Sequence, residues 1–147
     1  LTMRYIFILF FLISCSNNNN LHLSNLELLD DIMVEHDELM MEMKDLKNLK
    51  NGLSNKMEEN LEDQYQDRAK IVIDNLDDAH NSMMSFMKEF SDVFPFDNYP
   101  MSKEKYKNMS DEELKDVNDK LKSFQDKIIV VSEKFSSSKQ RASRMLN

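Results

Sequence analysis

Residues that break helices are almost absent from this chain, and their absence restricts the fold more than any other feature. One glycine and two prolines occur in 147 residues. The turns of an all-β fold need these residues at many positions, and long stretches of this sequence contain neither of them. The sequence therefore predicts an all-α fold.

Apolar residues recur at alternating spacings of three and four in three segments, which is the pattern of an amphipathic helix. The pattern predicts helices at about 24–50, 55–91 and 110–145, within one helical domain of residues 24–147. Short connections favour antiparallel neighbours, so we expect an antiparallel three-helix bundle with coiled-coil-like packing. Open-ended self-association is the alternative for the same pattern.

The apolar faces of the helices follow from these spacings. In the second helix the face runs from Tyr65 to Phe90, and in the third it runs from Leu114 through Phe135. In the first helix we expect a main row, widened by four further apolar residues: the row is Leu26, Leu29, Met33, His36, Met40 and Met43, and the widening residues are Ile32, Leu39, Leu46 and Leu53.

Capping patterns predict where two of the helices begin. The four-residue patterns that start at Ser24 and Ser110 both match the capping box, in which a serine hydroxyl and a glutamate side chain satisfy backbone amides of the first turn. The first and third helices are expected to begin at these two positions.

Breaking residues predict the connections. Gly52 follows Asn51, a pair that tolerates positive φ and predicts the end of the first helix, although the weakly apolar stretch 51–63 allows a later connection. Pro95 and Pro100 predict a loop after the second helix. We expect the aromatic residues at 94, 96 and 99 to close this end of the bundle.

The N-terminal residues have the features of an export signal followed by a lipidation site. Arg4 supplies a positive charge, and residues 5–13 form an apolar run of nine residues. A membrane span needs roughly 20 apolar residues. Leu-Ile-Ser stands directly before Cys15, the only cysteine of the chain. This arrangement is typical of a bacterial lipoprotein signal, the alternatives being an ordinary signal or an uncleaved anchor.

This interpretation divides the N-terminal part in two and predicts a location. We expect residues 1–14 to be the signal peptide, and residues 15–23 to comprise the lipid-bearing Cys15 and a flexible, asparagine-rich tether. The lipid would attach the protein to the membrane of the bacterial cell envelope. No acidic residue follows the cysteine directly, which favours an outer-membrane protein that faces the periplasm.

Charge and motif content exclude several classes of function. Nineteen basic and 27 acidic residues give a net charge of −8, which argues against nucleic-acid binding. Only Lys139, Arg141 and Arg144 form a basic cluster without nearby acids in the sequence, and we interpret them as favourable charges at a helix C-terminus rather than as a binding patch. The mature chain has no thiol beyond the anchor, no glycine-rich phosphate loop and no His-Glu-x-x-His motif, so we predict that it is not an enzyme.

Two histidines share one local pattern with methionines. The spacing His-x3-Met-x2-Met occurs twice, as His36, Met40 and Met43 and as His80, Met84 and Met87. Helical positions i, i+4 and i+7 lie on one face, and imidazole with thioether is a ligand set suited to Cu(I). The alternative is ordinary core packing, because methionine fills cores well.

The position of the first helical connection decides between these readings of the two histidines. A connection centred near residue 58 would place His36 opposite His80. A connection centred at Gly52 would place His36 opposite Arg68 instead, and the cluster would not form.

Several segments together resemble a known group of proteins. They are Cys15 with its preceding residues, His-Asp-Glu-Leu-Met at 36–40, Asp-Ala-His-Asn-Ser-Met-Met-Ser-Phe-Met at 78–87, Phe-Pro-Phe-Asp at 94–97 and Met-Ser-Lys-Glu-Lys-Tyr at 101–106. They are similar to small Bacteroidetes lipoproteins often labelled "viral A-type inclusion protein". The resemblance implies a bacterial origin, a lipid anchor and a helical fold, and it implies no established activity.

From these observations we expect an envelope lipoprotein that acts as a helical structural or interaction module, with an envelope protein as its partner. The alternative is a periplasmic protein that handles Cu(I) with the paired His/Met segments.

Overall fold

The computed structural model describes residues 17–95 and 108–147 of the chain. They form the helices α1 (Asn17–Glu59), α2 (Asp63–Val93) and α4 (Asp111–Leu146). All three pack against one another, and the described residues contain no strand, which confirms the predicted three-helix bundle. Within this described part, no helix has an apolar stretch long enough to cross a bilayer.

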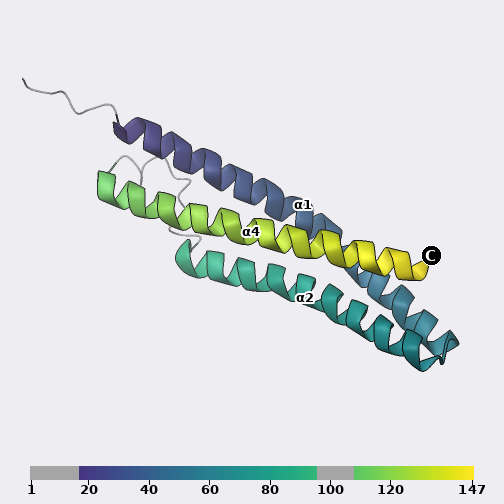
Figure 1. The fold of residues 1–147 in the computed structure, drawn as a ribbon. Helices are drawn as coiled ribbons and strands as arrows, with labels where there is room; N and C mark the ends of the chain where they lie inside the picture. Colours follow the sequence, from purple (N-terminus) through teal and green to yellow (C-terminus); the bar gives the residue numbers. More distant parts are fainter. Residues whose placement is uncertain (1–16, 96–107) are drawn as a thin grey trace, which may run out of the picture.

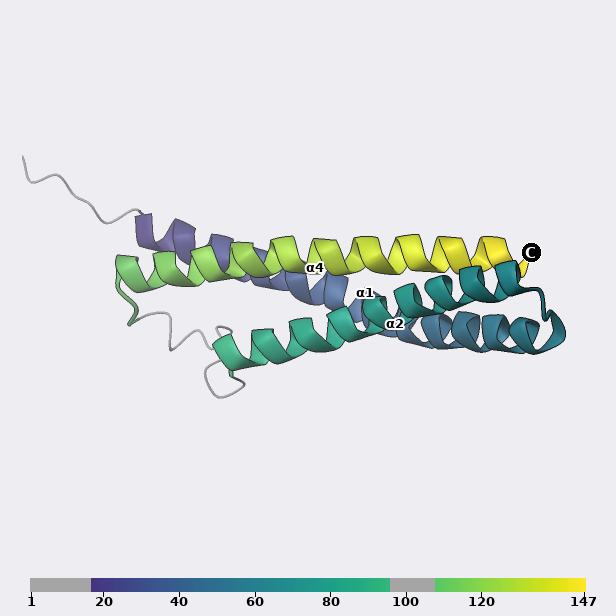
Figure 2. The same ribbon diagram turned by 60° about the horizontal axis from the view of Figure 1, so that its bottom comes forward.

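The bundle is long and narrow (Figure 1). α1 and α4 run in the same direction, and α2, which lies between them in the sequence, runs antiparallel to both. The α1–α2 connection and the C-terminal end of α4 therefore lie at one end of the molecule. The starts of α1 and α4 lie at the opposite end, as the turned view in Figure 2 also shows. We call the end with the α1–α2 connection the distal end, and the end where α1 and α4 begin the proximal end.

One row of side chains from each helix forms the core. The rows of α2 and α4 are the predicted ones. The row of α1 is rotated, because the four residues expected only to widen its face form the core together with Leu29, whereas Met40 of the predicted main row is 44% exposed. The buried apolar residues are Leu29, Ile32, Leu39, Leu46 and Leu53 in α1, Ala69, Leu76, Ala79, Met83, Phe86 and Phe90 in α2, and Leu114, Leu121, Phe124, Ile128, Val131, Phe135 and Ala142 in α4.

The predicted start of α1 at Ser24 is wrong, and so is the predicted tether over the last residues before it, because the helix already begins at Asn17. Ser24 is an exposed residue inside the helix. The next residue, Asn25, is buried against α4, where its amide donates to the carbonyl of Leu114 at 3.0 Å. Packing against α4 therefore stabilises α1 from Asn25 onward, directly after a segment whose composition alone favours a flexible chain.

The predicted end of α1 at Gly52 is also wrong. Gly52 lies inside the helix, and no described glycine has positive φ. A methyl group at its Cα would lie 3.3 Å from both terminal carbons of Leu146. The glycine thus serves close approach between α1 and the last turn of α4, and it does not end the helix.

The connection instead comprises residues 60–62, within the stretch that allowed a later connection, so the predicted start of the second helix near residue 55 is wrong as well. Gln66 closes the end of α1, because its side-chain amide donates to the carbonyls of Met57 at 2.6 Å and Asn60 at 2.5 Å. Asn60 Oδ1 accepts from the amide of Glu62 at 3.1 Å. Side-chain amides therefore satisfy the backbone groups of a turn that contains no glycine.

The end of α2 and the start of α4 agree with the sequence. α2 ends at Val93, two residues before Pro95, and Ser110 and Glu113 form the predicted capping box. Phe94 is buried and packs on Phe90 and Phe124, with ring centroids 5.2 and 6.0 Å away. The aromatics predicted at 96 and 99 and the rest of that loop lie outside the described residues.

Candidate functional site

The structure places the two histidines of the proposed metal site in different surroundings. The connection is centred three residues beyond the position that would align them. The Nδ1 atom of His36 lies 2.9 Å from a carboxylate oxygen of its neighbour Asp37. His80 is exposed on α2.

His80 lines a groove between α1 and α2 with a volume of about 460 Å³, and Met43 lines it from α1. Of the six predicted ligands, these two line the groove. Lys50 crosses the groove to Asp77, with its Nζ 2.6 and 2.7 Å from the two carboxylate oxygens. One imidazole and one thioether thus come from two helices to a single groove.

The remaining predicted ligands have other environments. Met40 and Met84 are exposed, the latter by 52%. Met87 is half-buried and packs against the core. Residues 17–95 and 108–147 contain no group of three histidine, cysteine, aspartate or glutamate side chains placed to hold a metal ion. Cys15, the predicted lipid anchor, lies outside the described residues.

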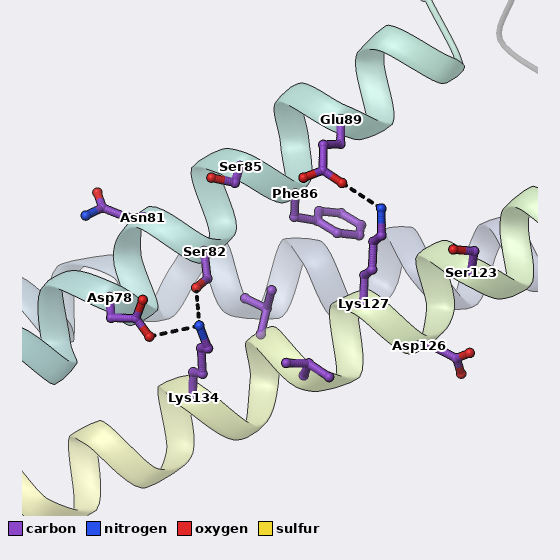
Figure 3. A pocket seen from close by; sticks show the side chains of 12 residues that line it. Asp78, Asn81, Ser82, Ser85, Phe86, Glu89, Ser123, Asp126, Lys127 and Lys134 are labelled. Atoms are coloured by element: carbon purple, nitrogen blue, oxygen red, sulfur yellow. Dashed lines mark hydrogen bonds and ion pairs between the residues drawn. The ribbon is translucent and has the colours of Figure 1, made fainter.

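A second groove runs between α2 and α4 in the middle of the bundle (Figure 3) and has a volume of about 530 Å³. We call it the α2/α4 groove. Phe86 from α2 and Val130 and Val131 from α4 supply its apolar surface. Two of the α2 residues that line it, Ser82 and Ser85, have short side chains. From α4 it is lined by Ser123, Asp126, Lys127, Val130, Val131 and Lys134.

Two lysines of α4 bridge the groove at separate points, as the dashed lines in Figure 3 show. Lys134 lies 2.8 Å from a carboxylate oxygen of Asp78 and donates to the hydroxyl of Ser82 at 2.9 Å. Lys127 pairs with Glu89 at 2.6 Å, and its Nζ also lies 5.0 Å from the centre of the Phe124 ring. Both lysines are therefore neutralised by acidic residues of α2, and exposed pairs of this kind add little to stability.

Asp126 gives the α2/α4 groove an excess of negative charge. It lines the groove and forms no ion pair with any other described residue. With Asp78 and Glu89 it makes three acids against two lysines. The groove is thus apolar at its centre and weakly acidic at its edge.

The sequence reasoning missed this groove, although the sequence carries a signal for it. Ile129 and Val130 are apolar residues that stand between the core positions Ile128 and Val131, and both are about half exposed. Two β-branched residues beyond the width of a core row indicate a second apolar face on α4.

The sequence reasoning also missed a buried polar pair between α1 and α4. Asn118 donates from its side-chain amide to Oδ1 of Asn25 at 2.7 Å. Both side chains are buried. Asn118 immediately follows Val117 of the predicted apolar row, so a polar residue beside that row was the available signal.

Comparison with protein-family models, with curated proteins and with solved structures found no match for this chain. Its function must therefore be argued from its own residues.

Proposed function

We propose that this chain is a lipid-anchored module of the bacterial envelope that uses the α2/α4 groove to bind a helix of another envelope protein. The observation that carries the proposal is the groove itself, an apolar channel of about 530 Å³ with half-exposed Val130 in it and charges along its edges. A groove between two helices is a common site for an amphipathic helix, which inserts its apolar face.

The chemistry of the groove defines the partner. The incoming helix needs an apolar stripe that packs against Phe86, Val130 and Val131. The short side chains of Ser82 and Ser85 leave room for it to approach α2 closely. Asp126 and the other acids at the edge favour a partner helix with basic residues beside its apolar stripe.

The dimensions of the bundle support a role as a spacer. α1 has 43 residues, which corresponds to a length of about 65 Å. Cys15 precedes its first residue by two positions, so a lipid on this cysteine would attach the proximal end to the membrane. The α2/α4 groove would then lie beyond the membrane surface, halfway along a stiff rod.

A matched pair of variants tests the groove. Val130→Glu places a charge in it, whereas Val34→Glu makes the same change on α1, at a valine that is likewise 52% exposed. Each full-length protein carries a photoreactive cross-linker at position 85 and is compared with wild type in living cells. We expect one cross-linked product in wild type and Val34→Glu and its loss in Val130→Glu. Equal cross-linking in both variants would refute the groove as the binding site.

The lipid anchor is tested separately. We expect the wild-type chain to incorporate a labelled fatty acid and to sediment with membranes, and Cys15→Ser to lose the label. A Cys15→Ser protein that keeps the label would contradict the anchor and leave the groove untouched.

Cu(I) binding is the second candidate, and the shared groove of Met43 and His80 favours it. A thioether and an imidazole are suitable ligands for this ion. In an anaerobic competition titration with a chromophoric chelator, we expect His80→Ala to abolish Cu(I) binding and His36→Ala, beside Asp37, to retain it. The absence of competition by the wild-type protein would refute this function.

A further inference from the structure

A hollow at the distal end lies between the first turns of α2 and the last turns of α4, with a volume of about 510 Å³. Tyr65 and Arg68 line it from α2, and Arg141 and Arg144 line it from α4. The two helices therefore bring three guanidinium groups into one site, although the chain as a whole carries a net charge of −8. We call it the arginine hollow.

None of these three arginines forms an ion pair within the described part of the chain. Arg68 donates only from Nε, to the carbonyl of Gln64 in its own helix at 3.3 Å. Lys139 behaves differently, because its Nζ lies 3.1 Å from Glu42 and 3.8 Å from Asp45. The basic residues at the end of α4 thus divide into a lysine that pairs with α1 and two arginines that form no ion pair with any described residue.

Tyr65 provides a second, independent observation. Its hydroxyl oxygen is buried and has no hydrogen-bond partner among residues 17–95 and 108–147. A buried hydroxyl without a partner costs stability, and such groups in native proteins usually have a reason. The hydroxyl belongs to a residue that lines the same hollow as the three arginines.

We propose that the arginine hollow binds the phosphate group of an anionic ligand. Guanidinium groups bind phosphate oxygens through paired N–H donors, and the phosphate charge relieves the repulsion among three like charges. After a side-chain rearrangement that exposes it, the Tyr65 hydroxyl supplies a further donor. Val72 and Met145 line the hollow as well, so an apolar part of a phosphate ester has a surface to contact.

Two sources could supply this phosphate, a soluble ester and a lipid headgroup. The site lies on other residues than the α2/α4 groove and does not depend on the function proposed for that groove. It also lies at the distal end, whereas α1 begins at the proximal end, so with the lipid anchor proposed above a headgroup bound in the hollow would belong to a second membrane.

The test measures the melting temperature of the full chain with millimolar inorganic phosphate against chloride at equal ionic strength. A ligand that binds only the folded state raises the melting temperature. We expect phosphate to raise that of wild type and to have no effect on the Arg141→Gln, Arg144→Gln double variant. The Lys88→Gln, Lys122→Gln double variant has the same change in charge outside the hollow and should respond like wild type.

The same experiment separates phosphate binding from a simple helix-end role. If the arginines only offset the negative end of the α4 dipole, their removal lowers stability and phosphate changes nothing in wild type. If they bind phosphate, their removal without phosphate leaves stability equal or higher, because repulsion is relieved. A phosphate effect that survives in the arginine double variant would overturn the proposal.

Tyr65→Phe gives a further readout, because we expect opposite effects on stability and on phosphate binding. The variant removes a hydroxyl that has no partner in the free protein, so we expect equal or higher stability without phosphate and phosphate binding weaker by about tenfold. Unchanged phosphate affinity would remove Tyr65 from the site.

Soluble dihexanoylphosphatidylglycerol, used below its micellar concentration, identifies the source. Tighter binding of this lipid than of inorganic phosphate, lost in the arginine double variant, would assign a lipid headgroup. Equal binding of the two would assign a soluble phosphate. No effect of either probe on wild type would overturn the proposal.

Discussion

At the scale of single residues, the buried pair of Asn25 and Asn118 is the feature that most specifies how α1 meets α4. Each side chain satisfies the other or a backbone carbonyl, as Asn25 does with Leu114. A buried polar pair stabilises less than an apolar pair of equal size, but it is satisfied in only one alignment of the helices. We infer that these asparagines set the register of α1 on α4.

Replacement of one asparagine should lower the free energy of unfolding more than replacement of both. In Asn118→Leu the Oδ1 atom of Asn25 loses its donor, and we expect the free energy of unfolding to fall by about 1–3 kcal/mol. The Asn25→Leu, Asn118→Leu double variant should recover most of this loss, because no partnerless group remains. Urea denaturation of the three proteins measures the difference. A double variant less stable than the single one would show that the pair itself is strongly stabilising.

At the scale of elements, α1 extends beyond both of the ends that its sequence predicts. From Asn25 onward it packs along α4, and near the other end Gly52 lies against Leu146 of α4. Lys56 adds a contact at the distal end, where its Nζ donates to the carbonyl of Leu146. The stability of this helix therefore comes from packing more than from intrinsic propensity.

Gly52→Ala compares two effects at this position: the gain in helix propensity and the steric cost of the close approach of Leu146. Alanine in a helix interior is favoured over glycine by up to about 1 kcal/mol. The new methyl group would lie 3.3 Å from the Leu146 side chain, which is half-buried and able to shift. We expect a small net rise in the melting temperature and a larger rise when Leu146→Ala is also present. A fall in both backgrounds would show that α1 cannot accept a side chain here.

The start of α4 has a pH-dependent component. The backbone amide and then the hydroxyl of Ser110 donate to Glu113 and hold the pKa of its carboxyl below the ordinary 4.5. A lowered pKa in the folded state stabilises the fold above pH 4.5, and this contribution disappears as the pH falls through the lowered value.

Glu113→Gln should therefore melt slightly below wild type at neutral pH and together with it in strong acid. Circular dichroism melts across this range measure the effect. Glu112→Gln, which makes the same change at the neighbouring exposed position, serves as the control and should show no such convergence. Parallel curves for Glu113→Gln and wild type at all pH values would contradict the capping contribution.

At the scale of the whole molecule, three apolar rows bury one another within a single chain. Ion pairs between helices lie along the outside of each seam: Lys50 with Asp77, Lys134 with Asp78, and Lys139 with Glu42. The apolar rows are thus buried without a second copy of the chain, which argues against open-ended self-association.

We expect the melting temperature to be independent of protein concentration over a hundredfold range. A self-assembling coiled coil would melt at higher temperature when concentrated, because association stabilises the folded state. Thermal melts at several concentrations, together with sedimentation equilibrium, distinguish the two. A concentration-dependent melt would indicate that an exposed apolar face, such as the one containing Ile129, joins copies of the chain.

The sequence by itself determined the helical class, the core rows of α2 and α4 and the cap at Ser110, because each depends on neighbours three or four residues apart. Only the tertiary structure decided the length of α1, the use of Gly52 and the register of the histidines. It also decided that Arg68 joins Arg141 and Arg144, and that Val130 faces a groove. These features depend on which residues meet across tens of positions in the chain, and local spacing carries no information about that alignment.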